Sequence, residues 1–182
     1  MKILGTTITN SLSWNKNTRI LVQKVNKRML LIKKIQSFGA SVEELVHLWI
    51  VYCRSVLEQS AVVWSSSLTA ENKADLERTQ KGFAKQILKS QYKSFGNSLM
   101  ILNLPTLEKR RSELTLKFAK DCLKNEKFSN LFPENEHRNI NTRFPEKYEI
   151  PHCNTQRMKS SSLNTMRHQL NQDHRETQNC DS

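Results

Sequence analysis

The stretch 45–64, LVHLWIVYCRSVLEQSAVVW, constrains the fold more than any other part of this 182-residue chain. Its apolar residues recur at spacings of three, four and seven along one line, from Leu45 to Val63, and a second apolar line covers the adjoining side. A helix that is apolar over so much of its circumference is surrounded by other elements. We therefore predict a central, buried helix over these residues.

A membrane-spanning helix is the alternative interpretation of this stretch, because twenty residues are long enough to cross a bilayer. Arg54 and Glu58 lie near its middle, and His47 belongs to it as well. Each charge at the centre of a bilayer would cost about 2–3 kcal/mol or more. Arg54 and Glu58 are instead four residues apart on one helix face, where they can pair with each other or with neighbouring helices. The sequence favours a buried helix and no membrane partner.

Start and stop signals place further helices on both sides of this stretch. Gly39 can cap the C-terminus of the helix that precedes it, and Ser41 with Glu44 forms a capping box at the start of the central one. Thr69 and Thr106 can cap the two main helices that follow. The predicted helices span residues 15–37, 45–64, 70–89, a short part of 92–104, and 107–125.

The two ends of the chain differ from this helical pattern. Residues 2–9 have the composition of one short strand with no later partner. From Pro133 onward polar residues dominate, so we expect mostly loop, with an extended piece over 144–151 and a weak helix over 160–171. The predicted fold is mainly α, a bundle of about four to five helices with one short N-terminal strand and a largely irregular C-terminal tail. The expected domains are a helical region, residues 1–132, and a low-order polar tail, residues 133–182.

The net charge of +12 lies entirely in the helical part of the sequence. Residues 1–132 hold 22 Lys and Arg against 10 Asp and Glu, whereas residues 133–182 hold 7 against 7. Such a basic region is typical of a protein that contacts a polyanion, although solubility also produces excess charge. On the predicted helix over 70–89, four cations at spacings of three, four and four form one stripe, for which an ordinary solvated face is the alternative interpretation. They are Arg78, Lys81, Lys85 and Lys89.

Two residues of these helices do not fit their surroundings. Gly82 lies inside the helix over 70–89, where glycine costs about 1 kcal/mol relative to alanine, so we expect a close contact with another helix there. Arg111 interrupts the apolar stripe of the helix over 107–125. It either extends its charge to solvent or pairs with a buried carboxylate. The candidate partners are Glu58, Glu77 and Glu108.

No catalytic arrangement is visible in the sequence. A two-metal nuclease or polymerase needs clustered carboxylates, but Asp75, Asp121, Asp173 and Asp181 are each isolated. None of the five histidines begins the His-x-Asp motif of an iron oxygenase, and four glycines leave no room for a glycine-rich phosphate loop. We therefore predict that the chain is not an enzyme by itself and holds no cofactor.

The cysteines and histidines do not follow a recognisable disulfide or metal-binding pattern. Cys53 and Cys122 lie on apolar helix stripes and are expected in the core, and the four cysteines include no CxxC pair. A metal site in the tail would need irregularly spaced ligands. Because the first residues contain no signal peptide, we expect an intracellular protein of the cytoplasm or nucleus. The tail residues available to such a metal site are His137, His152, Cys153, His168, His174 and Cys180.

Several motifs follow one another in a distinctive order. Ile3-Leu4-Gly5 and LSWN precede the basic segment NKRMLLIKKI, and the segment RFPEKYEIPHCNTQRMKSSSLNTMRHQLN closes the series at residues 143–171. The strongest motifs lie between them: RSVLEQSAVVW (54–64), DLERTQKGFAKQIL (75–88) and LNLPTLEKRRSELTLKF (102–118). Over residues 3–171 this order resembles the region just after the catalytic palm in reverse transcriptases of non-LTR, LINE-like retrotransposons.

The resemblance implies a piece of a larger enzyme. In that family the metal-binding aspartates lie in the palm, commonly in a Tyr-x-Asp-Asp motif that this sequence lacks, and the parent polymerase would use Mg²⁺. The helices here would correspond to the thumb and connection, which grip the template–product duplex through its backbone. The chain would then be a truncated, non-catalytic remnant of an RNA-directed DNA polymerase, with the palm as a missing partner. The residues that match the family's motifs are Trp14, Arg54, Glu58, Trp64, Glu77, Gln80, Pro105, Arg110 and Arg111, most of which we interpret as framework.

The leading functional hypothesis is sequence-independent binding of RNA, DNA or an RNA–DNA hybrid through basic helix faces. One alternative is a helical protein–protein interaction module with no nucleic-acid role. Another is that the sequence is a partial gene model of an intact reverse transcriptase. The candidate nucleic-acid-binding residues are Lys27, Arg28, Arg78, Lys81, Lys85, Lys89, Arg110 and Lys117.

Overall fold

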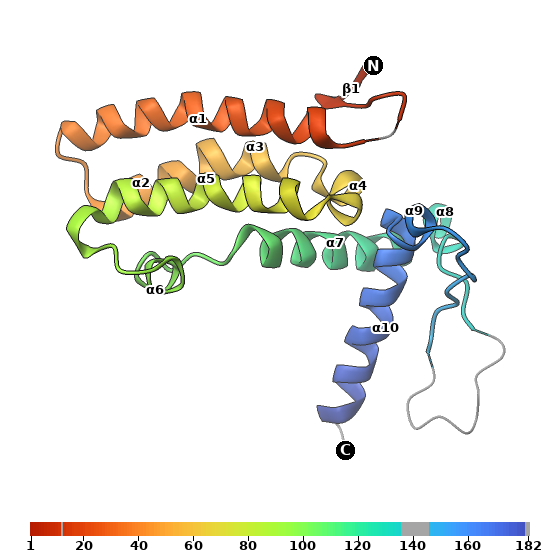
Figure 1. The fold of residues 1–182 in the computed structure, drawn as a ribbon. Coiled ribbons are helices and arrows are strands. Elements are labelled where there is room, and N and C mark those ends of the chain that lie inside the picture. The colour runs from red at the N-terminus through yellow and green to blue at the C-terminus, as the bar shows by residue number, and fades with distance from the viewer. Residues whose placement is uncertain (12, 136–145, 181–182) are drawn as a thin grey trace. The chain divides into compact units, whose positions relative to one another are not determined.

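The structure is a computed structural model that describes residues 1–11, 13–135 and 146–180, and it is mainly helical, as the sequence predicts (Figure 1). The chain divides into two compact units, which are described one at a time below. Within the described ranges, no helix combines the length and the apolar composition that a bilayer crossing requires.

The first unit comprises Met1–Ala61 and Leu68–Arg111, and the second comprises Val62–Ser67 and Ser112–Ser182. The positive charge follows this division, because the first unit contains 18 Lys and Arg against 7 Asp and Glu, whereas the second contains 11 against 10. The boundary therefore falls earlier in the chain than the expected one at residue 132. The reason is that later residues of the helix preceding that position pack with tail residues in a core of their own.

The N-terminus forms a β-hairpin, where the sequence predicted a single strand over residues 2–9. β1 (Lys2–Ile3) pairs antiparallel with β2 (Thr6–Thr7). The turn residues Leu4 and Gly5 both have positive φ values, 46° and 85°, which suit a two-residue hairpin turn. The pairing was missed because strands of two residues are too short to show an alternating pattern.

The helix α1 (Asn15–Ser37) confirms the predicted helix over 15–37. Its predicted stop signal is also confirmed, because Gly39 has a φ of 91° and its N–H donates to the carbonyl oxygen of Gln36 over 3.1 Å. The hairpin is joined to the start of α1 by Asn17, whose Oδ1 accepts a hydrogen bond from the N–H of Thr7 (3.0 Å). The buried apolar residues of α1 are Leu21, Val25 and Ile32.

The central stretch is not one continuous helix, so this prediction is wrong. It forms α2 (Val42–Leu48), the π-helix η1 (Trp49–Arg54), α3 (Ser55–Glu58) and α4 (Ala61–Trp64). The helical hydrogen bonding ends where Ser60 takes up a positive φ of 53°. An apolar pattern predicts which residues are buried, but it does not report a change of helix type or a break of two residues.

A contact with the N-terminal hairpin accompanies the break. The Gln59 side chain donates from Nε2 to the carbonyl oxygen of Leu4 over 3.1 Å. Gly5 lies so close to this amide that a Cβ atom at Gly5 would be 2.4 Å from Nε2. Local periodicity could not have shown this contact, because its partners are separated by 55 residues.

The helix α5 (Ala70–Leu88) runs parallel to α1 (Figure 1). Hydrogen bonds join the two helices near both ends: Asn72 Nδ2 donates to Asn15 Oδ1 (2.7 Å), and Gln36 Nε2 donates to the carbonyl oxygen of Gln86 (3.4 Å). The predicted cap is confirmed, since the side chain of Thr69 accepts a hydrogen bond from the N–H of Asn72.

The aromatic centre of the first unit joins α5 to the central stretch. The ring of Phe83 stacks on that of Trp49, with centroids 4.6 Å apart and planes inclined by 16°. The predicted burial of the central stretch is confirmed for seven of its apolar residues, although Val51, Tyr52 and Val63 are exposed. The buried ones are Leu45, Trp49, Cys53, Val56, Leu57, Ala61 and Trp64.

Two shorter elements and one long helix follow α5. They are the 3-10 helix η3 (Lys89–Gln91), α6 (Phe95–Ile101), and α7 (Leu107–Leu123), which contributes residues to both units. The predicted cap of α7 is confirmed, because Thr106 Oγ1 accepts a hydrogen bond from the N–H of Lys109 over 3.1 Å.

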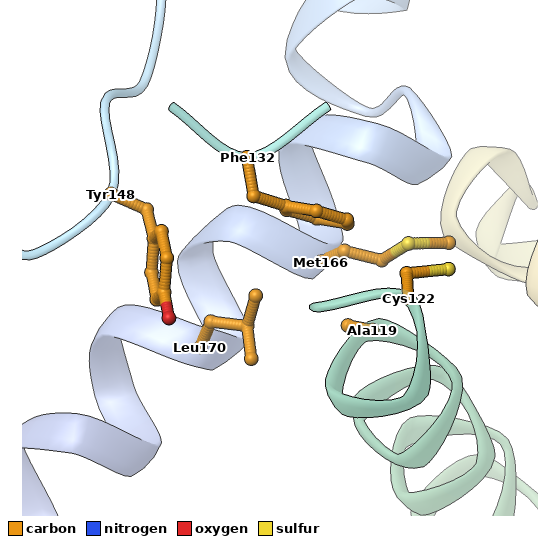
Figure 2. Packing of buried hydrophobic residues seen from close by; sticks show 6 residues of the cluster. All are labelled: Ala119, Cys122, Phe132, Tyr148, Met166 and Leu170. Carbon is orange, nitrogen blue, oxygen red and sulfur yellow. The ribbon is translucent and has the colours of Figure 1, made fainter. Parts of the chain in front are cut away.

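The second unit has its own small core (Figure 2). It is built around α10 (Ser162–Cys180), whose Met166 and Leu170 face Ala119 and Cys122 of α7. The burial predicted for Cys122 is confirmed. The remaining elements of this unit are the 3-10 helix η2 (Ser65–Ser67), α8 (Glu126–Ser129) and α9 (Gln156–Lys159).

The described part of the tail contains more helix than predicted. The described part of 133–161 is irregular apart from α9 and a single bridge between Glu134 and Tyr148. This bridge agrees with the extended piece predicted over 144–151, of which residues 144–145 lie outside the described residues. The weak helix predicted over 160–171 is present, but it continues to Cys180 as α10. The helix contains few apolar residues, so the sequence pattern predicted too short a length for it. Figure 2 shows that Phe132 and Tyr148 complete the core beside it.

Candidate nucleic-acid interface

The predicted basic stripe of α5 lies on the surface of the first unit. Arg78, Lys81 and Lys85 are at i, i+3 and i+7, so they lie along one side of the helix and span about 10 Å of its axis. The fourth predicted member, Lys89, follows the end of α5 and has a φ of 47°, so helical spacing does not place it on that side, and this part of the prediction is wrong. The side chain of Arg78 is 72% exposed. The four residues of the predicted stripe, all exposed, are Arg78, Lys81, Lys85 and Lys89.

Two members of this α5 stripe have neighbours that orient them. Arg78 Nη1 lies 2.5 Å from Asp75 Oδ1, one turn earlier on the same helix. The ammonium group of Lys85 lies 5.4 Å from the ring centroid of Tyr92, within the range of a cation–π interaction. Because both side chains remain exposed, these contacts leave the α5 stripe accessible to a large polyanion.

The close helix contact expected at Gly82 is wrong. A Cβ atom built on Gly82 would have no described atom within 4 Å, apart from its chain neighbours and the local helix backbone. Gly82 is exposed, and its backbone lies in the ordinary helical region. The packing of the described residues therefore does not explain why a glycine stands at this position inside the helix.

The two candidate cations on α1 have different surroundings. Lys27 is exposed. Arg28 is half-buried, its guanidinium lies 4.3 Å above the ring centroid of Tyr52, and its Nη1 donates to the carbonyl oxygen of the same residue. The surroundings of Arg28 therefore indicate a framework role.

Glu58 links two arginines of the resemblance motifs. Its Oε1 lies 3.2 Å from Nε of Arg54, four residues earlier, and 3.0 Å from Nε of Arg110 on α7. Both predicted kinds of pairing are therefore confirmed: Arg54 pairs with Glu58 within the stretch, and Glu58 also pairs with Arg110 of a neighbouring helix. Arg110 is two-thirds buried in this arrangement, so its charge is used inside the first unit.

The predicted pairing of Arg111 is also confirmed, and Glu77 is the partner. Arg111 is buried, with its Nη2 4.0 Å from Glu77 Oε1. Burial lowers the pKa of the Arg111 guanidinium, while the carboxylates of Glu77 and Glu108 oppose that shift. An arginine stays charged under these conditions, so the ion pair persists.

The other motif residues belong to the framework around these ion pairs. Gln80 donates from Nε2 to the carbonyl oxygen of Pro105 over 2.8 Å, which joins α5 to the segment before α7. Trp14 is half-buried at the start of α1. Trp64 is buried, as predicted for the stretch 45–64, and it lies in the segment that belongs to the second unit. Lys117 is exposed and also belongs to that unit.

Sequence reasoning missed the partners that distinguish a free cation from an engaged one. Tyr52 was expected in the core, and no local signal could have shown that it holds Arg28, 24 residues earlier. Asp75, three residues before Arg78, could have been found from helical spacing alone. The salt bridge between Lys73 and Glu108 (2.9 Å) spans 35 residues and had no such signal.

The tail contains histidines and cysteines that could ligate a metal. Among the residues with described positions, no three His, Cys, Asp or Glu side chains come together as a metal site. Two of the tail residues available to such a site, His137 and the side chain of Cys180, lie outside the described part of the chain.

The chain matches no protein-family model, no curated protein and no solved structure. The resemblance to retrotransposon reverse transcriptases therefore stays a prediction that depends on the sequence motifs alone.

Proposed function

We propose that the first unit binds the backbone of RNA, DNA or an RNA–DNA hybrid without reading its sequence. The observation that carries this proposal is the α5 stripe, in which the exposed cations Arg78, Lys81 and Lys85 follow one helix side and Lys89 is exposed directly after the helix. Regularly spaced cations on a rigid helix can neutralise successive phosphates and release their counterions, which is the main source of non-specific affinity.

The charge of the first unit supports the same proposal. Its excess of 18 Lys and Arg over 7 Asp and Glu creates a positive potential that attracts a polyanion. The second unit, with 11 against 10, has almost no net charge. We therefore assign binding to the first unit and give Lys117, in the second, a minor role.

The contacts of the other candidates revise their expected roles. Lys27 is exposed and remains a candidate, whereas Arg28 and Arg110 are engaged with Tyr52 and Glu58. Replacing either arginine would disturb the framework as well as any ligand, so neither is suited to a test of binding.

The wider hypothesis is that the chain derives from the thumb and connection of a retrotransposon RNA-directed DNA polymerase. In this proposal the chain binds and does not catalyse, and the Mg²⁺ of the parent enzyme belongs to a palm that would act as partner. An intracellular location, in the cytoplasm or nucleus, is part of the same proposal.

Salt-dependent binding of a short RNA–DNA hybrid, measured by fluorescence anisotropy, tests the proposal. Four phosphate contacts predict that the logarithm of the binding constant falls with the logarithm of salt concentration with a slope of about −3.6. Reversing the charge of Lys81, Lys85 and Lys89 to glutamate should weaken binding strongly and reduce the slope to about −1.

A matched variant reverses the charge of Lys16, Lys127 and Lys159, which are exposed and lie outside the α5 stripe. It has the same net charge as the first variant, so it separates the local stripe from the overall charge. Equal loss of affinity in the two variants would show that the stripe has no special role. Absence of any binding by the unaltered chain at low salt would reject the proposed function.

A further inference from the structure

Gly82 lies in the middle of the α5 stripe. It follows Arg78 by four residues and precedes Lys85 by three, so it lies on the same line along the helix as the cations. Lys81 is its immediate neighbour. The most cationic side of α5 is therefore interrupted at its centre by a residue with no side chain.

Nothing in the described parts of the molecule requires glycine at this position. Gly5 and Gly39 have positive φ values, which other residues rarely adopt, but Gly82 does not. A side chain at Gly82 would project into open space with respect to the described atoms. Since a helical glycine costs about 1 kcal/mol relative to alanine, α5 gives up stability here without a gain in internal packing.

Close approach of a ligand to the main chain is one use of glycine, and at Gly82 cations lie one turn to either side. On the basis of the proposed function, we propose that the sugar–phosphate strand crosses α5 at Gly82. The missing side chain lets the strand touch the helix surface, and the cations one turn to either side then reach the phosphates before and after the crossing point.

Gly96 provides a matched comparison. It is exposed, a Cβ there would also have no described neighbour within 4 Å, and its φ is not positive. However, α6, the helix that contains it, has no Lys or Arg. Bulk added at Gly96 therefore tests the general effect of replacing a surface glycine with a larger residue.

The experiment compares Gly82→Leu with Gly96→Leu, using anisotropy on the RNA–DNA hybrid and thermal unfolding followed by circular dichroism. Gly82→Leu should unfold at the same temperature as the unaltered chain or higher, because leucine favours a helix. Its affinity should fall by about tenfold, the effect of losing one well-formed contact, and the salt slope should become shallower. Gly82→Ala should have an intermediate effect, and Gly96→Leu should bind as the unaltered chain does.

The two possible failures can be distinguished. If the unaltered chain binds the hybrid with the expected salt slope and Gly82→Leu binds equally well, the crossing point is rejected and the proposed function stands. An equal loss in Gly96→Leu would also reject it, because the effect would then not depend on the α5 stripe. If the unaltered chain does not bind, the proposed function fails and this inference fails with it.

Discussion

The carboxylate of Glu77 on α5 faces the buried guanidinium of Arg111 on α7, with 4.0 Å between Oε1 and Nη2. The same carboxylate accepts hydrogen bonds from the N–H groups of Leu107 (3.3 Å) and Glu108 (2.7 Å). It therefore balances a buried cation and also caps a helix N-terminus, where the exposed N–H groups attract negative charge.

We expect Glu77→Gln to destabilise the protein by about 2–4 kcal/mol, because the amide keeps the shape but removes the carboxylate charge that faces the buried Arg111. Urea unfolding followed by circular dichroism measures this effect. Glu108→Gln is the matched control: Glu108 is exposed and pairs with Lys73, so the loss there should be less than about 1 kcal/mol. Equal losses in the two variants would contradict the role assigned to Glu77.

The thiol of Cys53 should resist alkylation in the folded protein. Burial raises its pKa to about 11, although the positive charge of Arg28 acts in the opposite direction. Because the thiolate is the reactive form, a maleimide at neutral pH should label the half-buried Cys153 first and Cys53 only after unfolding. Mass spectrometry of labelled peptides distinguishes the two sites, and rapid native labelling of Cys53 would contradict its burial.

The same raised pKa predicts a loss of stability in alkaline solution. A thiol that titrates near its usual value of 9.0 when unfolded, and at about 11 when folded, releases its proton on unfolding between these values. Its contribution to stability is complete below pH 9.0 and is lost as the pH rises toward 11. Cys53→Ala should reduce this alkaline loss, which unfolding curves at several pH values would measure.

Acid should remove the contribution of the Lys73–Glu108 salt bridge. The hydrogen bond from Lys73 and its charge lower the pKa of Glu108 below its usual 4.5, while partial burial opposes the shift. A lowered pKa in the folded state means that the contribution is present above 4.5 and is lost as the pH falls through the folded value. Since Glu108 is exposed and Lys73 is only partly buried, Lys73→Met should cost less than about 1 kcal/mol at neutral pH and almost nothing in strong acid. A difference independent of pH would contradict the pairing.

Signals that act within one turn of a helix could be read from the sequence. The Ser41 and Glu44 pair forms both hydrogen bonds of a capping box, and Thr69 and Thr106 cap the helices that they were expected to cap. These interactions join residues three positions apart, so the sequence contains the whole of their geometry.

Features that depend on distant residues could not be read in the same way. The break at Ser60 is accompanied by a contact between Gln59 and Leu4, and the engaged state of Arg28 depends on Tyr52. For the candidate interface, spacing alone predicted the α5 stripe. Only the three-dimensional structure shows which candidate cations are exposed and which contact other residues of the chain.

In the second unit, too, a contact between distant residues could not be predicted from the sequence, and it is made by a polar residue beside the core. Asn171 on α10 accepts a hydrogen bond at Oδ1 from the N–H of Tyr148 (2.8 Å) and donates from Nδ2 to the carbonyl oxygen of Tyr148 (2.9 Å). Asn171 is almost fully buried. Its amide therefore takes the place of a neighbouring strand for Tyr148. The polar composition of the tail predicted little regular structure, but here a polar residue is part of the packing.

We expect Asn171→Ala to release this segment from α10, because both main-chain groups of Tyr148 would lose their partner inside the protein. Such losses cost about 1–3 kcal/mol for each unsatisfied group. Hydrogen exchange followed by mass spectrometry should show faster exchange of the Tyr148 amide, with no change in the amides of α5. Gln172→Ala, at the exposed neighbouring position, should leave exchange unaltered. Uniform acceleration across the whole chain would mean that Asn171 contributes to global stability and does not hold this segment locally.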